Sequence, residues 1–219
     1  MGAERRVPLT KDLVLRAAIR LADQGGIESL SMRKLGQALG VEAMSLYNHV
    51  ASKDDILDGI ADYVLTEIDL PGTDGDWEAA IRRCALSAHA TLSAHPWACT
   101  LIMSIPRPLP GRLRYTESVL RCLRRAGFSA GTAYHGYHAI DSHILGFTLW
   151  AAGHSLSSIS RDDVAAFVPM LAAEGYPYLA EHAEQHLARA DKDENGDESE
   201  FEFGLRLIID GLRTMRVTR

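Results

Sequence analysis

The stretch Ser31-Met-Arg-Lys-Leu-Gly-Gln-Ala-Leu-Gly-Val-Glu-Ala-Met-Ser-Leu-Tyr-Asn-His-Val50 decides the fold of this chain. It predicts two short helices, over residues 32–39 and 43–50, that meet at a tight turn. Ser31 is a good N-cap for the first helix, and Gly40 supplies the positive φ that ends it. Two short helices joined in this way form a helix-turn-helix, whose second helix lies in a major groove of DNA.

The residues of this stretch separate onto two faces. Four apolar residues are spaced so that their side chains point toward the interior: Leu35, Leu39, Val41 and Leu46. Gly36 has no side chain and therefore lets the second helix approach closely. The outward face of the second helix carries Ala43, Met44, Tyr47 and Asn48. Taken singly, two residues have another interpretation, because Tyr47 can cover the edge of the core and His49 can cap a helix or pack.

Helical periodicity continues on both sides of the motif. Thr10 caps a helix that ends at Gly25-Gly26, and Ser52 opens a longer helix through Ile68, with Asp55 in a capping-box position. After a loop at 71–75, further helices are predicted over residues 77–94, 96–105, 111–126, 132–152, 162–173, 178–190 and about 201–215. The helix at 132–152 is apolar on most sides, so we expect it to be buried nearly all round. No stretch alternates as a strand does, so the fold class is all-α.

Composition is that of an ordinary globular protein. Of the 219 residues, 47% are hydrophobic and 24% are charged, so a core can be buried. No apolar run approaches the roughly 18 residues of a membrane helix, and no signal peptide follows the arginines near the start. Cys84, Cys99 and Cys122 are odd in number and far apart, so we expect reduced, buried thiols in a cytoplasmic protein.

The charge is unevenly distributed along the chain. The formal net charge is −6, yet residues 1–53 hold eight Lys or Arg against five Asp or Glu. Residues 54–219 hold 15 Lys or Arg against 24 Asp or Glu. A basic head on an acidic body suits a protein that presents one end to phosphates.

Residues 10–65 resemble the TetR family of repressors. The resemblance rests on Gly25-Gly26-Ile27, Ser31-Met32-Arg33-Lys34-Leu35, Gly40-Val41, Ser45-Leu46-Tyr47-Asn48-His49-Val50 and Ser52-Lys53-Asp54-Asp55-Ile56-Leu57. It implies that Tyr47, His49 and Lys53 hold DNA phosphates and that Arg33 reaches a base. The DNA-contacting residues predicted in this way are Ser31, Arg33, Ala43, Met44, Ser45, Tyr47, Asn48, His49 and Lys53.

The chemistry of these residues suits such contacts. Lys53 begins a helix, so its ammonium group and the helix N-terminus favour the same phosphate. Arg33 can make a bidentate contact with guanine, worth roughly 1–3 kcal/mol of discrimination between bases. Asn48 can pair with adenine, and Met44 can contact a thymine methyl group. Operator choice is therefore expected at Ala43, Met44 and Asn48.

The remainder is similar, more weakly, to the C-terminal domain of the tetracycline-repressor subgroup. The similarity lies in Asp76-Trp77-Glu78, His95, Gly127-Phe128-Ser129 and the helix from Tyr134 to Trp150 with Gly146-Phe147. It implies a homodimer whose four-helix bundle is built from helices 132–152 and 201–215 of each copy. The small residues Gly136, Ala139 and Gly146 permit close approach, and a two-fold dimer matches a palindromic site. The alternative is that these two helices are only monomer core.

A pocket for a small-molecule effector is predicted in this body. Its candidate residues are His89, Trp97, Ile102, Met103, Tyr134, His138, Asp141, His143, Phe147 and Trp150. A few polar groups among apolar walls are typical of a ligand site, and equally of an ordinary helical core. The segment Pro106–Pro110 is either a gate to the pocket or a stiff connector.

The nine histidines raise the question of a metal site. His135 and His138 are three residues apart, but Asp141 is the sole acidic residue at a matching offset. Drug-binding members of the subgroup place a magnesium-binding histidine where this chain has Ile102. The resemblance therefore does not extend to tetracycline or magnesium, and we expect neutral histidines, no metal and no cofactor.

The sequence as a whole predicts a transcription regulator. We expect a helix-turn-helix domain over residues 1–52, a connecting helix over 53–70 and a helical ligand-binding and dimerisation domain over 71–219, with a mobile acidic loop at 191–200. The protein would repress by binding palindromic operator DNA as a homodimer and leave it when an effector binds. An enzyme is the main rival, but no nucleophile–base pair, phosphate loop or zinc motif is present. The other rival is an interaction module without DNA binding.

Overall fold

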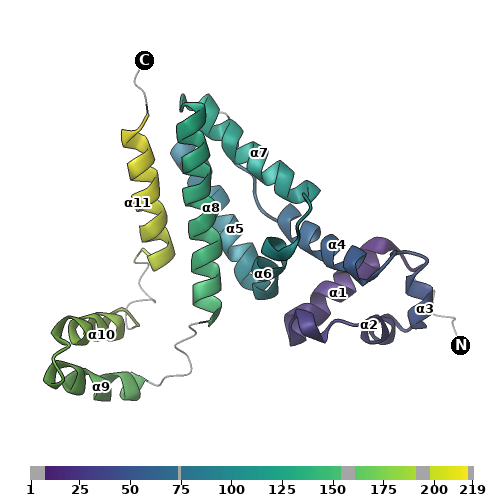
Figure 1. Ribbon diagram of the computed structural model, residues 1–219, viewed down its shortest axis with the longest axis horizontal. Coiled ribbons are helices and arrows are strands. Elements are labelled where there is room, and N and C mark those ends of the chain that lie inside the picture. The colour runs from purple at the N-terminus through teal and green to yellow at the C-terminus, as the bar shows by residue number, and fades with distance from the viewer. Residues whose placement is uncertain (1–7, 74, 154–160, 191–197, 217–219) are drawn as a thin grey trace, which may run out of the picture.

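The computed structural model describes residues 8–73, 75–153, 161–190 and 198–216. Within these ranges the chain forms helices and no strand, which confirms the all-α prediction (Figure 1). Residues 191–197 of the predicted acidic loop lie outside the described residues. None of the described helices combines the length and apolar character that a bilayer span needs.

The head consists of α1 (Lys11–Gly25), a 3-10 turn η1 (Ile27–Ser29), α2 (Met32–Leu39) and α3 (Ala43–Leu46). Thr10 caps α1 by accepting a hydrogen bond from the Leu13 amide, as its sequence position predicted. Helix α4 (Lys53–Thr66) leads from the head into the body. It packs against α1 on one side and against α6 and α7 on the other.

The body is built around α8 (Ala130–Gly153), which contacts α5 (Trp77–Ala94), α6 (Pro96–Ser104), α7 (Pro110–Arg125) and α11 (Glu200–Thr214). Buried apolar side chains form one continuous core from the head into this bundle. The three cysteines are buried and free, as predicted. Burial raises the pKa of Cys84 to about 12, so its thiol stays protonated.

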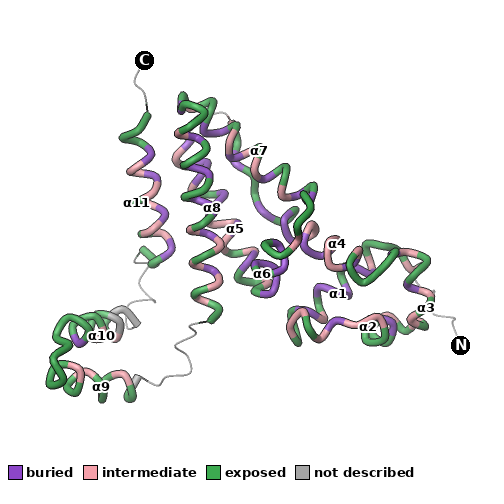
Figure 2. The backbone as a smooth tube through the Cα atoms, in the orientation of Figure 1, coloured by how far each residue is buried: buried purple, intermediate pink, exposed green. Residues whose placement is uncertain are grey.

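Helix α8 is buried on one side only, so the prediction of burial nearly all round is wrong for the single chain. Ile140, Asp141 and Ile144 face the core. The opposite side is exposed, and Figure 2 shows exposed residues alternating with buried and intermediate ones along the helix. Its members include Tyr134, His135, His138, Ser142, Gly146 and Trp150. The prediction failed because aromatic and small residues on this side, such as Trp150 and Gly146, give the same sequence signal as core residues, although no described part of the chain buries them.

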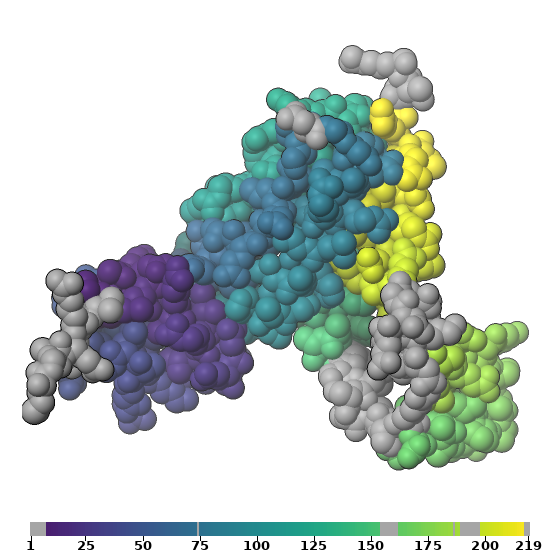
Figure 3. All heavy atoms as spheres, turned by 180° about the vertical axis from the view of Figure 1, so that it is seen from behind, coloured from purple at the N-terminus to yellow at the C-terminus, as the bar shows by residue number. Residues whose placement is uncertain are grey.

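Helices α9 (Arg161–Ala173) and α10 (Pro177–Ala190) pair with each other, with Ala180 buried between them. Figure 3 shows this pair as a separate lobe beside the bundle. It exposes several large apolar side chains, namely Phe167, Met170, Tyr176, Tyr178 and Leu179. The pair joins the end of α8 to the start of α11 in the chain order.

Gly36→Ala is expected to destabilise the head. A Cβ at Gly36 would lie 2.8 Å from the backbone oxygen of Val41, so α3 would have to move. We expect a loss of about 1–3 kcal/mol in the free energy of unfolding, measured by urea denaturation. Gly131→Ala is the control, because its Cβ would meet only Ser129 Oγ at 3.9 Å. Equal effects of the two substitutions would contradict the close approach.

Candidate functional site

The turn between α2 and α3 is fixed by two local features. Ser31 Oγ accepts a hydrogen bond from the Lys34 amide at 3.2 Å and so caps α2. Gly40 ends α2 in the left-handed conformation, with φ of 65°. With Gly36 pressed against the Val41 carbonyl, these features hold α3 across α2 as a helix-turn-helix requires.

Helix α3 is shorter than predicted, because it ends at Leu46 rather than Val50. The Tyr47 amide donates to the Met44 carbonyl, and the Asn48 amide donates to the Ser45 carbonyl. These bonds span three residues instead of four, so the last part of the predicted helix is a tightened turn. Leu46 and Val50 remain buried beneath it.

The outward side of the motif is open to solvent. Met44 is 76% exposed and Tyr47 is 47% exposed, large values for apolar and aromatic residues. Three polar residues of the predicted set, Arg33, Asn48 and Lys53, are exposed as well. The others, Ser31, Ala43, Ser45 and His49, are half-buried. The predicted set thus comes from the start of α2, from α3 and the turn after it, and from the start of α4, and each member is exposed or half-buried.

The start of α4 is anchored to the head beside Lys53. Ser52 Oγ accepts from the Asp55 amide at 3.1 Å, as a capping residue does. The Asp55 carboxylate accepts from the Ala51 amide at 3.0 Å and from Lys11 Nζ at 2.9 Å. The hydrogen bond from Lys11, and next the one from Ala51, lower the pKa of Asp55. The predicted capping box is thus altered, since the carboxylate reaches Ala51 instead of Ser52.

A small cavity of about 10 Å³ lies inside the body, where α4, α5, α6, α7 and α8 meet. It has room for about one water molecule. Its walls are Leu65, Ile68, Ala88, Leu92, Ile102, Arg112, Tyr115, Asp141, Ile144 and Leu145. Of the predicted pocket residues, only Ile102 and Asp141 are among them. The sequence reasoning missed Arg112 and Tyr115.

The polar end of the cavity holds an ion pair. Arg112 Nη2 donates to Asp141 Oδ2 at 2.6 Å. Burial raises the pKa of Asp141, and the charge and hydrogen bond of Arg112 partly offset this shift. Burial, and next the charge of Asp141, raise the pKa of Tyr115 well above its ordinary value. Tyr115 therefore keeps its proton and remains a hydrogen-bond donor.

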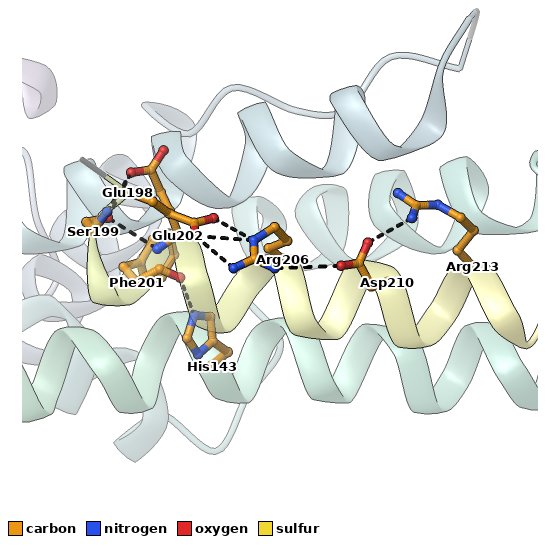
Figure 4. Close-up of polar contacts among 8 residues, drawn as sticks. All are labelled: His143, Glu198, Ser199, Phe201, Glu202, Arg206, Asp210 and Arg213. Atoms are coloured by element: carbon orange, nitrogen blue, oxygen red, sulfur yellow. Dashed lines mark hydrogen bonds and ion pairs between the residues drawn. The ribbon is translucent and has the colours of Figure 1, made fainter. Parts of the chain in front are cut away.

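Three other predicted pocket residues, His89, His143 and Phe147, surround Phe201 at the start of α11. The rings of His89 and His143 both stack on Phe201, with centroids 4.1 and 4.8 Å away. His143 Nε2 also donates to the Phe201 carbonyl at 2.9 Å (Figure 4). A Cβ at Gly204 would meet His143 Cε1 at 2.5 Å, so the ring lies directly on α11. This cluster anchors α11 to the bundle.

The tautomer of His89 follows from its partner. Thr148 Oγ1 donates to the Ile144 carbonyl at 2.7 Å, so it accepts from His89 Nδ1 at 2.8 Å. Neutral His89 therefore carries its proton on Nδ1. Burial, and next the charge of His143, lower the pKa of His89 and favour this neutral form.

The remaining predicted pocket residues lie elsewhere. Tyr134, His138 and Trp150 are on the exposed side of α8, and Met103 is exposed on α6. Trp97 is buried at the junction of head and body, where its Nε1 donates to Asp23 of α1 at 2.7 Å. The same Asp23 oxygen lies 2.7 Å from His95 Nδ1. The ten predicted residues thus do not form a single pocket.

Helix α4 is also tied to the segment between α6 and α7. Asp58 forms an ion pair with Arg107, and Asp62 accepts a hydrogen bond from the Gly111 amide. Pro106–Pro110 is therefore attached to α4 by charged and hydrogen-bonded groups at both ends. In the described part of the chain, no three His, Cys, Asp or Glu side chains gather as metal ligands would.

A helix-turn-helix head on an all-helical body defines a DNA-binding regulator with a separate C-terminal domain. The family described as "Bacterial regulatory proteins, tetR family" matches residues 14–60, and "Tetracyclin repressor-like, C-terminal domain" matches residues 70–216. The chain belongs to the TetR family of transcriptional regulators.

Several relatives match along most of their length. The HTH-type transcriptional repressor DrrR1 of Streptomyces coeruleorubidus is 31% identical over 96% of this chain and 80% of the relative. Tetracycline repressor protein class C of Escherichia coli is 30% identical over 96% of this chain and 93% of the relative. Among solved structures, ActR of Streptomyces coelicolor in complex with actinorhodin is 26% identical, with a TM-score of 0.74 over 97% of this chain and 100% of that chain.

Lowering the pH is expected to destabilise the fold through His89. Its pKa is lowered from 6.5 in the folded chain, so the unfolded chain binds the proton more readily. Stability is therefore lost as the pH falls below 6.5 toward the folded-state pKa. Urea denaturation between about pH 5 and 8 should show a flatter pH dependence for His89→Gln than for the wild type. His182→Gln, at an exposed histidine of α10, should keep the wild-type slope; a wild-type slope in His89→Gln would count against this assignment.

Proposed function

We propose that this protein is a repressor that binds palindromic operator DNA as a homodimer and releases it when a small effector enters the body. The observation that carries the proposal is that the side chains of Arg33, Met44, Tyr47, Asn48 and Lys53 are all exposed, whereas Leu35 and Leu46 of the same helix-turn-helix are buried. We assign the DNA-binding domain to residues 1–52, the connecting helix to 53–70 and the ligand-binding and dimerisation domain to 71–219. Because the chromosome is its target, the proposal includes a cytoplasmic location.

The residues of the head divide into two roles. Lys53 at the N-terminus of α4, with Tyr47 and His49 on the preceding turn, would hold phosphates and set the register on DNA. Ser31 and Ser45 offer hydroxyl groups for further backbone contacts. Arg33, Ala43, Met44 and Asn48 would face base edges. Large exposed side chains such as Met44 at the tip of the motif fit this role better than a role in stability.

The dimer interface would be the exposed side of α8 together with that of α11. Tyr134 and Trp150 are more than half exposed on α8, and Phe203 and Leu207 are exposed on α11. Added Cβ atoms at Gly146 and Gly211 would meet nothing within 4 Å, so a second copy can approach closely there. A pair of heads on one two-fold axis doubles the phosphate contacts and matches two half-sites.

Release would be transmitted through α4. This helix forms part of the cavity wall through Leu65 and begins beside the reading face at Lys53. An effector that parts the cavity walls would move α4, and the Asp58 and Asp62 contacts would carry the 106–110 segment with it. The two heads would then no longer fit successive major grooves.

A catalytic role is not part of the proposal. The nearest approach to a catalytic dyad is Asp141 with His138. Asp141 is engaged by Arg112, whereas His138 lies on the exposed side of α8. The actinorhodin complex of ActR supports a ligand-binding body, and we extend that role to this chain.

Alanine substitution of Tyr47 and Lys53 together should weaken operator binding. Each lost phosphate contact should reduce the salt slope of log K by about 0.9. The duplex is first selected from random DNA with the wild type, and affinity is then measured at several salt concentrations. Arg114→Ala, at an exposed arginine of α7, is the control. A folded double variant with wild-type affinity and salt slope would exclude the proposed reading face.

Leu207→Arg should dissociate the dimer, because it places a charge on a face that we propose is buried between copies. Leu113→Arg is a matched control, since Leu113 is 56% exposed on α7 and Leu207 is 55% exposed on α11. Sedimentation analysis should show monomers only for Leu207→Arg, with operator affinity reduced in parallel. Equal sedimentation of both variants as dimers would place the interface elsewhere.

A further inference from the structure

The first turn of α4 meets two opposing electrostatic demands. Asp54 and Asp55 follow Lys53 directly, and carboxylates at this end of a helix stabilise it through the helix dipole. A DNA phosphate held by Lys53 would meet the same two carboxylates, and charges of the same sign repel. Asp54 is exposed, so water and salt screen its charge, whereas Asp55 is half-buried. The charge of Asp55 is therefore the one that opposes DNA binding with less screening.

Asp55 is fixed in place by the backbone that enters α4. Its amide donates to Ser52 Oγ at 3.1 Å, and its Oδ2 accepts from the Ala51 amide at 3.0 Å. The hydrogen bond from Lys11, and next the one from Ala51, lower the pKa of Asp55, so this carboxylate is ionised at neutral pH. It cannot turn away from a phosphate without giving up the contact that sets the start of the helix.

Lys11, at the start of α1, brings a positive charge to this carboxylate. Its Nζ lies 2.9 Å from Asp55 Oδ1, the oxygen that the Ala51 amide does not use. In the ranges that the structure describes, no other basic side chain forms an ion pair with Asp55. The Lys11 side chain is 51% exposed, and surface ion pairs of this kind contribute little to stability. What the pair changes most is therefore the charge close to Lys53.

We propose that Lys11 is a positioning residue for operator binding. It cancels the charge of Asp55, so that Asp55 can set the start of α4 without repelling the phosphate at Lys53. The inference rests on the phosphate contact proposed for Lys53. It makes the charge of Lys11 useful only while Asp55 is charged, and it does not require Lys11 to touch DNA.

The test is a double-mutant cycle on operator affinity, with the duplex selected by the wild type. Lys11→Met keeps an unbranched apolar stem without the charge, and Asp55→Asn keeps an oxygen that can accept from the Ala51 amide. Lys11→Met should weaken binding about threefold in roughly 50 mM salt, because it leaves an uncompensated negative charge near a phosphate. Adding Asp55→Asn to Lys11→Met should restore wild-type affinity. Asp55→Asn alone should bind at least as tightly as the wild type.

Salt gives a second measurement that a structural role would not change. The deficit of Lys11→Met should shrink at about 300 mM salt, since exposed charges are then screened over shorter distances. Two patterns would overturn the inference. If the pair acted only by holding α1 against α4, Asp55→Asn would weaken binding and the double variant would not recover. If Lys11 itself held a phosphate, the double variant would stay as weak as Lys11→Met.

Arg121→Met is the matched control. Arg121 forms an ion pair with Glu117 at 3.1 Å on α7, and its side chain is 49% exposed against 51% for Lys11. This variant loses the same formal charge from the body and should keep wild-type operator affinity. An equal loss in both variants would assign the effect to net charge and reject the inference. Urea denaturation of all the variants should give nearly equal midpoints, whereas a loss of affinity that follows a loss of stability would make the role of Lys11 structural.

The double alanine variant of Tyr47 and Lys53 is measured on the same duplex to separate the two levels of the argument. If it binds as the wild type does, the proposed phosphate contacts are wrong. If it binds weakly but the Lys11→Met and Asp55→Asn double variant does not recover, only the role assigned to Lys11 is rejected.

Discussion

Helix α4 packs closely against both the head and the body, and the proposed coupling between the two depends on this constraint. On the head side, a Cβ at Gly59 would lie 2.6 Å from Leu15 Cδ2 of α1. On the body side, a Cβ at Gly111 of α7 would lie 2.8 Å from Leu65 Cβ of α4. Close-packed interiors transmit displacement instead of absorbing it. In the proposed release, a displacement of the cavity wall would therefore reach α1 through a helix that is closely packed at both of these contacts.

The sequence was most informative where local rules decide the structure. Gly40 and the Ser31 cap predicted the turn of the head, because both act within a few residues of themselves. The end of α3 was misjudged, since helical periodicity does not distinguish a four-residue from a three-residue hydrogen-bonding pattern. The cavity was largely unpredicted. Arg112 and Asp141 are 29 residues apart, and nothing local marks Arg112 among the other arginines of α7 as the one that turns inward.

The overestimated burial of α8 has a physical cause. Sequence periodicity reports which sides of a helix are apolar, but not whether the same chain covers them. Core residues such as Ile140 and Ile144 and exposed residues such as Trp150 give one continuous apolar signal. In the proposed dimer the second copy covers the exposed side. The pattern that overestimates burial in one chain is the pattern that an interface formed by α8 requires.

The cavity at the centre of the body sets a condition on the proposed release. Its volume of about 10 Å³ is enough for about one water molecule, so a larger effector would have to part the walls. Such an effector can shift the heads only by the difference between its affinities for the two arrangements. Because Leu65 of α4 is one of these walls, parting them would move the helix that leads to the head, and this movement would supply that difference.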